Sequence, residues 1–275
     1  MLDQIKSQPC KSTIGILFAA KSKIIKHWKT LDARITDAAN EAKDNVKYLY
    51  TLMKFCKPLK RCSPVEMLDC IPGLINAIRM INSISRYYNT SERMTSLFVK
   101  VTNQMVSACK NYILKDVSKI WELPRDQALQ RIEDALQLNI EYQACFRRTK
   151  EKLKESPQDK QFDFSEKYIF GKFEIFARRL EKVKDMLLTM DRFSILATSK
   201  LEGMDHHNKQ WSAVVGMAKK KNYDLLDHRR QEFEVDYEDF LRSVDMLQNK
   251  LQKFMETCVE KQSSVSFISL ILRIS

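Results

Sequence analysis

The residues best suited to chemistry in this sequence do not form a catalytic motif. Gly171-Lys172 is its one glycine–lysine step, and a phosphate-binding loop would need another glycine where Glu166 stands. The motifs GxSxG, HExxH and GxGxxG do not occur. Asp236 and Glu238 are expected on a solvated helix face, without the pocket that acid–base catalysis needs. We therefore expect no enzyme activity and no catalytic, cofactor-binding or metal-binding residues.

The seven cysteines do not follow a metal-binding pattern. Their number is odd and no CxxC occurs. Most lie at or beside apolar helical positions, where a free cysteine behaves as a small hydrophobe, and this usage indicates a reducing compartment. Cys56, Cys62 and Cys70 have the wrong spacing for a zinc site. His206 and His207 are expected in a polar loop rather than as a pair of ligands.

Basic residues are the main candidates for binding a partner. Lysine and arginine outnumber aspartate and glutamate to give a formal net charge of +12, which suits anionic partners. Four of them are expected to lie off the apolar seam of one helix and to face water: Arg178, Arg179, Lys182 and Lys184. They are the candidate partner-binding residues, and the alternative is that they only keep the helix soluble. Nucleic acid is a weaker alternative, because the basic clusters are scattered and no RRM, KH or zinc-finger signature accompanies them.

The helix that carries these residues is predicted over 164–193, within the stretch 162–193. Its seam keeps an unbroken heptad spacing through Ile169, Phe173, Phe176, Leu180, Val183, Leu187 and Met190. Aromatic residues at seam positions favour a roomy bundle within one chain over a zipper dimer. Asp163 followed by Glu166 predicts a capping box at the start of the helix.

A second seam of similar length is predicted near the C-terminus. It runs through Phe233, Tyr237, Phe240, Val244, Leu247, Leu251, Phe254 and Cys258. The simplest expectation is that these two seams bury each other. Five acidic residues between Glu232 and Asp239 are expected to face either 219–221 or the basic outer face of the 164–193 helix.

The N-terminal half also reads as long helices. One is predicted over 21–56, with a heptad through Trp28, Leu31, Ile35, Ala38, Ala42, Leu49 and Leu52 and with polar Asn45 in the missing slot. Helix starts are predicted at 63–66 and at 89–92, and Pro72-Gly73 is expected to interrupt the helix that contains it. Another helix is predicted over 125–154. A turn around Gly203 and a short helix through Trp211 and Ala218 are expected further on.

These elements predict an all-α protein built from elongated, consecutive helical bundles. Only five glycines and six prolines are present, which favours long helices and few turns. The best linker is 156–161, so we expect one bundle over 1–156 and a second over 157–261. Residues 262–275 form an atypical apolar tail, too short to span a membrane.

Four blocks resemble a known family: LDARITDAANEAKDNVKYLYTL (31–52), IPGLINAIRMINSISRYYNTSERMTSLFVKVTNQM (71–105), QFDFSEKYIFGKFEIFARRLEK (161–182) and KKKNYDLLDHRRQEFEVDYEDF (219–240). They resemble the N-terminal tail, or stem, of axonemal dynein heavy chains of the outer-arm gamma type. The resemblance covers about 20–261 in the family's order. Met1 falls inside the family's segment, so the upstream dimerising part is expected to be missing and the chain to be a fragment, partial gene model or short isoform.

The resemblance implies a non-catalytic scaffold in the axoneme of cilia and flagella. In such proteins the stem carries intermediate and light chains, associates with other heavy chains and attaches the arm to the doublet microtubule. The ATPase motor of the family lies far downstream and is absent from this chain. The implied partners are therefore these dynein subunits, with no nucleic acid and no membrane. An unrelated spectrin-like scaffold or a basic nucleic-acid-binding helical protein are the alternatives.

Overall fold

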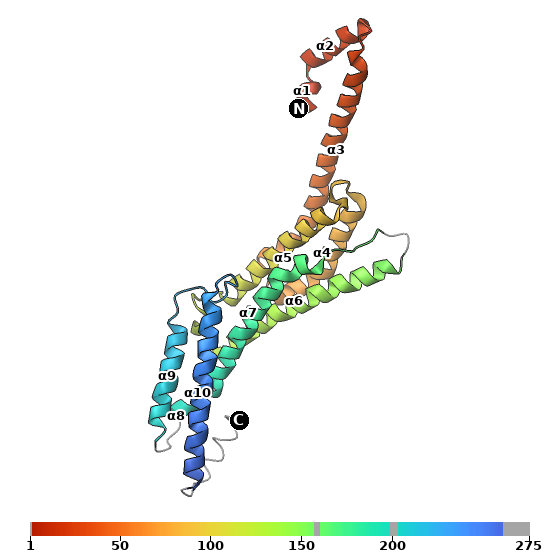
Figure 1. Ribbon diagram of the computed structural model, residues 1–275. Helices are drawn as coiled ribbons and strands as arrows, with labels where there is room; N and C mark the ends of the chain where they lie inside the picture. Colours follow the sequence, from red (N-terminus) through yellow and green to blue (C-terminus); the bar gives the residue numbers. More distant parts are fainter. Residues whose placement is uncertain (1, 157–159, 199–202, 261–275) are drawn as a thin grey trace. The chain divides into compact units, whose positions relative to one another are not determined.

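The protein is all-α, as predicted (Figure 1). The computed structural model describes residues 2–156, 160–198 and 203–260, and no strand occurs in these ranges. The predicted apolar tail, 262–275, lies outside them. The α-helices are α1 (Leu2–Ile5), α2 (Gln8–Ala19), α3 (Ile24–Cys56), α4 (Pro64–Ile84), α5 (Ser91–Ile113), α6 (Arg125–Lys154), α7 (Glu166–Arg192), α8 (Ile195–Thr198), α9 (Asp205–Lys219) and α10 (Glu232–Glu260). Short 3₁₀ turns occupy Pro58–Lys60, Tyr87–Asn89 and Ile120–Glu122.

The chain forms two compact units, and neither is a continuous segment. The first consists of 1–62, 66–104 and 142–169, and the second of 63–65, 105–141 and 170–275. Helices α5, α6 and α7 therefore each contribute residues to both units. The predicted division into two bundles at 156–157 stays a prediction, because a compact unit in space need not coincide with a domain of the chain.

Aromatic side chains form part of the core of the first unit. Phe98 of α5 and Phe146 of α6 meet edge to face, with ring centroids 5.4 Å apart. Phe162 and Phe164, in the extended segment before α7, complete the cluster, and the Phe162 centroid lies 5.3 Å from that of Phe146. Their burial fixes the chain just before α7 begins, since each large aromatic ring removes substantial apolar area from water.

The predicted capping box at Asp163 is wrong. Helix α7 begins at Glu166, where the Ser165 carbonyl accepts from the Tyr168 and Ile169 N–H groups. Asp163 lies in the extended segment instead, and its carboxylate pairs with Lys150 of α6 at 2.7 Å.

Helix α4 is not interrupted at Pro72-Gly73, contrary to the prediction. It runs without a break through both residues. Buried side chains lie on both sides of them, including Met67, Ile71, Leu74, Ile75 and Ile78. Proline removes one helical hydrogen bond and glycine lowers helix propensity, at roughly 3 and 1 kcal/mol, and packing of this whole apolar face outweighs both.

Other boundaries agree with the sequence. Helix α4 begins at Pro64, α5 at Ser91, and α6 spans the predicted 125–154. Gly203 has φ +88°, which confirms the predicted turn. His206 and His207 were expected in a loop and instead lie in the first turns of α9, where the His207 ring is 5.4 Å from that of Phe254.

Most of the predicted seam of α7 is buried. Six of its seven residues are buried, and Met190 is half-buried. The seam of α10 also meets a neighbour that was not predicted, because α10 packs along α9 (Figure 1). Phe240 contacts Trp211 of α9 with ring centroids 6.3 Å apart, and Trp211 also contacts Phe193. Phe233 and Tyr237 of the α10 seam contact Arg179 and Asp185 of α7, and mutual burial of the two seams stays a prediction.

Candidate partner-binding surfaces

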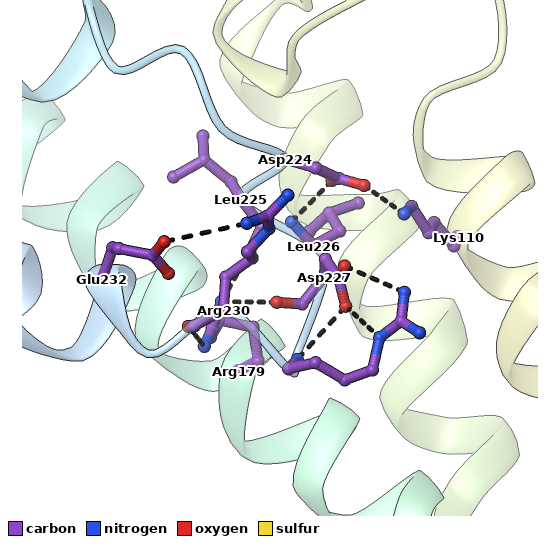
Figure 2. A network of polar contacts seen from close by, with 9 residues as sticks. Lys110, Arg179, Asp224, Leu225, Leu226, Asp227, Arg230 and Glu232 are labelled. Carbon is purple, nitrogen blue, oxygen red and sulfur yellow. Dashed lines mark hydrogen bonds and ion pairs between the residues drawn. The ribbon is translucent and has the colours of Figure 1, made fainter.

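Arg179 was predicted to face water, and that prediction is wrong. Its side chain is 3% exposed. Its Nη1 donates to the carbonyls of Leu225 and Asp227 at 3.2 and 3.1 Å. Its Nη2 donates to the Arg230 carbonyl at 2.8 Å and to the Glu234 carboxylate at 3.2 Å. Figure 2 shows this guanidinium surrounded by the backbone of the segment between α9 and α10.

The hydrogen bonds from Arg179 stabilise the segment between α9 and α10. The connection between α9 and α10 is irregular, so its carbonyls lack helical partners. Its turns are stabilised from within by two carboxylates, since Asp224 accepts from the Leu226 N–H at 3.0 Å and Asp227 from the Arg229 N–H at 3.2 Å. The planar fork of an arginine can serve several remaining acceptors at once, which a lysine cannot. The guanidinium also stacks 4.1 Å from the centroid of the Phe233 ring.

Two more of the four candidate residues are paired within the chain. Lys182 forms an ion pair with Glu234 of α10, and Lys184 pairs with Glu133 of α6 at 2.9 Å. Only Arg178 of the four has an exposed side chain. The binding of a partner by these residues stays a prediction, and the structure gives three of them contacts inside the second unit.

The predicted orientation of the acidic run is confirmed for two of its five residues, Glu234 and Asp236. Glu234 faces Arg179 and Lys182 of α7, and Asp236 pairs with Lys221 at 2.6 Å. Asp236 also accepts a hydrogen bond from the Tyr223 hydroxyl at 2.6 Å. The acids at the start of α10 therefore join it to α7 and to the segment after α9.

Each carboxylate in this network has hydrogen-bonding or cationic partners that stabilise its ionised form. Burial acts to raise the pKa of Glu234, but Lys182 and Arg179 outweigh it and hold that pKa below its ordinary value. Burial opposes Lys221 and Tyr223 in the same way at Asp236, whose pKa is also lowered. Hydrogen bonds from Arg229 hold the pKa of Asp227 well below its usual range. These carboxylates are ionised at neutral pH and already have cationic or hydroxyl partners, so the network serves structure.

Helix α3 presents the opposite situation, since its apolar seam is largely uncovered. It forms the predicted long helix, yet Leu52 is its one buried residue. Short helices α1 and α2 contact it, and Asn45 accepts a hydrogen bond from the Ser85 hydroxyl at 2.7 Å. The predicted register residue is thus used to hold α3 to the end of α4.

An apolar row is left open on the C-terminal half of α3. It comprises Ala42, Val46, Leu49, Tyr50 and Met53, and is bordered on one side by Lys43, Lys47 and Lys54; we call these eight residues the α3 patch. Val46 is 67% exposed and Tyr50 75% exposed, and all three lysines are exposed. Ala42 and Met53 are exposed as well, and Leu49 is half-buried. A largely exposed apolar row of this kind is typical of a protein-binding surface.

Sequence analysis missed Val46, Tyr50 and Met53. The heptad was read through Leu49 and Leu52, and Val46 and Tyr50 continue a neighbouring row from Ala42 at four-residue spacing. That spacing was the available signal. It shows that two adjacent rows of α3 are apolar, although it does not show which row the rest of the chain covers.

The described residues contain no group of three or more histidine, cysteine, aspartate or glutamate side chains placed to hold a metal ion. The six cysteines whose side chains are described are not disulfide-bonded, and Cys109 is buried. Across the same described ranges, no helix is both long and apolar enough to cross a membrane.

Comparison with known proteins gives one consistent result. Residues 1–275 match the family described as dynein heavy chain, N-terminal region 1. Over 96% of its length the chain is 54% identical to dynein axonemal heavy chain 5 of Rattus norvegicus. Over 95% of its length it is 48% identical to dynein axonemal heavy chain 8 of Homo sapiens and 38% identical to the dynein gamma chain, flagellar outer arm, of Chlamydomonas reinhardtii. It spans only 8%, 6% and 6% of these relatives, respectively.

Proposed function

The chain belongs to the dynein heavy chain N-terminal region 1 family, as its sequence blocks predicted, and we propose that it is a non-catalytic stem segment that scaffolds assembly of an axonemal dynein arm. Its expected location is the axoneme of cilia and flagella, because the relatives are named as axonemal or flagellar outer-arm dyneins. Its expected partners are dynein intermediate and light chains and other dynein heavy chains.

One observation carries this proposal. Helix α3 has 33 residues and buries only Leu52, while Ile24, Leu31, Val46, Tyr50 and Met53 stay between 40% and 75% exposed. Leaving such side chains in water forgoes roughly 25 cal/mol per Å² of apolar surface. A scaffold that receives another subunit along α3 recovers that free energy on assembly. Such a helix favours a segment that forms part of a larger assembly.

The arrangement of charged residues supports a structural rather than a catalytic role. Around Arg179 the acids and bases pair with one another and with backbone carbonyls. A catalytic acid or base needs a pKa tuned toward the working pH, whereas the pKa values of Asp227, Glu234 and Asp236 are shifted away from it.

The test is reconstitution of the full chain with axonemal dynein subunits. The chain is co-expressed with tagged dynein intermediate and light chains, and complexes are isolated through the tag. We expect the chain to co-purify in constant ratio with at least one subunit. Failure of every dynein subunit, heavy chains included, to retain a chain that circular dichroism shows to be helical would overturn the proposal.

A further inference from the structure

We propose that the α3 patch is bound by an amphipathic α-helix of a partner protein whose apolar stripe is bordered by acidic residues. This inference rests on the proposed function for its biological setting, but the chemistry of the partner is argued from the patch itself. The patch lies wholly within the first compact unit.

The apolar row has the shape that a helix recognises. Ala42, Val46, Leu49, Tyr50 and Met53 recur at spacings of three and four residues, which places them on one side of α3. From Ala42 to Met53 the row spans roughly 16 Å, or about three helical turns. Ala42 permits a close approach of backbones at one end, while Tyr50 and Met53 supply area at the other. A partner helix of a few turns matches this footprint.

The three lysines beside the apolar row favour a partner that carries acidic residues. Lys43 and Lys47 are one turn apart, and Lys54 follows two turns after Lys47 on the same side of the row. The Lys47 side chain is 77% exposed, and its ion pair with Asp44 is long, at 3.5 Å. Such an exposed pair contributes little, so the ammonium remains available. Acidic residues on a docked helix would face all three lysines.

The acids of α3 lie on another side of the helix. Asp37, Glu41 and Asp44 line a groove with Ile84 and Arg86 at the end of α4. Charge is therefore segregated around α3, with a lysine border on the apolar row and carboxylates next to α4. Acidic residues are therefore favoured on the side of a docked helix that faces the lysines and disfavoured on the side that faces the carboxylates.

A second copy of this chain fits the patch less well. Two α3 helices packed antiparallel through the apolar row would bring like borders together, lysine against lysine. Nucleic acid would use the lysines but not the apolar row, in which Val46 and Tyr50 would remain exposed. A partner helix with acidic borders satisfies both features.

The test uses two synthetic helical peptides and the full chain. Both peptides carry the same leucine stripe; one has glutamate and the other has lysine at the bordering positions. Binding is measured by fluorescence anisotropy at low and moderate salt. We expect the glutamate peptide to bind at least about tenfold more tightly than the lysine peptide and to lose affinity as salt rises.

Two patch variants and one control variant test whether peptide binding depends on the patch. Val46→Asp with Tyr50→Asp should weaken the glutamate peptide at least about tenfold. Lys43→Glu, Lys47→Glu and Lys54→Glu together should reverse the preference toward the lysine peptide. Lys209→Glu changes an exposed lysine of α9, outside the patch, and should leave both affinities unchanged. Circular dichroism should show the same helicity in every variant, since the substituted side chains are exposed.

Equal binding of the two peptides, binding of neither, or binding that the patch variants do not change would overturn the inference. So would a patch-dependent dimer in sedimentation velocity, which would make a second copy the occupant. The reconstitution separates this inference from the proposed function. If dynein subunits retain the patch variant as well as the wild type, the function stands and this surface is wrong.

Discussion

Arg178 and Arg179 are adjacent on α7 and carry the same charge, yet they occupy opposite environments. Arg178 is exposed, whereas Arg179 is buried against three carbonyls and the Glu234 carboxylate. One residue is a rotation of about 100° around the helix, which is enough to turn a side chain from solvent toward α10. The pair therefore offers a matched comparison of a surface and a structural arginine.

Arg179→Ala should lower the free energy of unfolding by about 3–5 kcal/mol, because it leaves buried acceptors and Glu234 without their partner. Arg178→Ala should change it by no more than about 0.5 kcal/mol. Urea unfolding followed by circular dichroism measures both. Arg179→Lys keeps the charge but not the fork, so it should fall between them. Equal, small effects at both positions would contradict the assigned role.

The carboxylates of the same network should make stability depend on pH in the acid range. The pKa values of Glu234, Asp236 and Asp227 are lowered in the folded protein, so the unfolded chain binds more protons as the pH falls. Their contribution to stability is present above their unfolded pKa values, about 4, and is lost as the pH falls through the folded ones. Glu234→Gln should flatten the dependence measured by urea unfolding between neutral and acid pH. An unchanged slope would exclude Glu234 as a contributor.

At the scale of elements, α10 is held by different contacts on its two neighbours. Its polar contacts with α7 run through Glu234 and Tyr237, whose hydroxyl donates to Asp185 at 2.8 Å. Its aromatic contact with α9 runs through Phe240 and Trp211. The packing of α10 on α9 is therefore testable apart from its ion pairs with α7.

Phe240→Ala and Trp211→Ala should be non-additive, because their rings touch. Phe173→Ala should cost about 3–5 kcal/mol, since its ring is fully buried in the seam of α7. Combined with Phe240→Ala, it should give nearly the sum of the two single effects. A double-mutant cycle in urea measures each coupling energy. Strong coupling of Phe240 with Phe173, and none with Trp211, would contradict the aromatic contact with α9 and favour direct packing of the two rings in the seams.

Gly73 shows how α4 and α3 approach each other within the first unit. A Cβ at this position would lie 2.6 Å from Cε1 of Phe55, too close for the ring to stay in place. Gly73→Ala should therefore destabilise the protein by about 1–3 kcal/mol in thermal unfolding, despite the higher helix propensity of alanine. Phe55→Leu should relieve the cost in the double variant. A stabilising Gly73→Ala would mean that Phe55 moves freely.

At the scale of the whole molecule, helix content is the direct measure of the architecture. We expect circular dichroism of the purified chain to report roughly 70–80% helix, far above the ~30–35% of an average globular protein. Long helices and scarce glycine and proline are the reason. A spectrum dominated by strand would contradict the fold.

Contacts within the second compact unit determine which residues can be substituted to test partner binding. Reversing the charge of Arg179 and Lys182 would break contacts with Glu234 and the segment between α9 and α10. Loss of binding in that variant would not separate recognition from folding. Exposed Arg178 and the lysines of the α3 patch are the positions where a charge change reports on recognition alone.

The sequence by itself determined the features that depend on neighbours along the chain. Heptad spacing predicted α3, α7 and α10, because side chains three and four residues apart share a helix face whatever lies opposite. Local capping chemistry predicted the starts at Pro64 and Ser91. The quoted blocks predicted the family, which the match over residues 1–275 confirmed.

Only the tertiary structure decided which faces are covered and by what. Arg179 is buried because the segment between α9 and α10, far away in sequence, brings three of its carbonyls to the guanidinium. Helix α4 continues through Pro72 because its apolar face is packed on both sides of the proline. Periodicity showed that α3 has an apolar side but not that the side is left open, because burial is a property of two surfaces and the sequence pattern describes one.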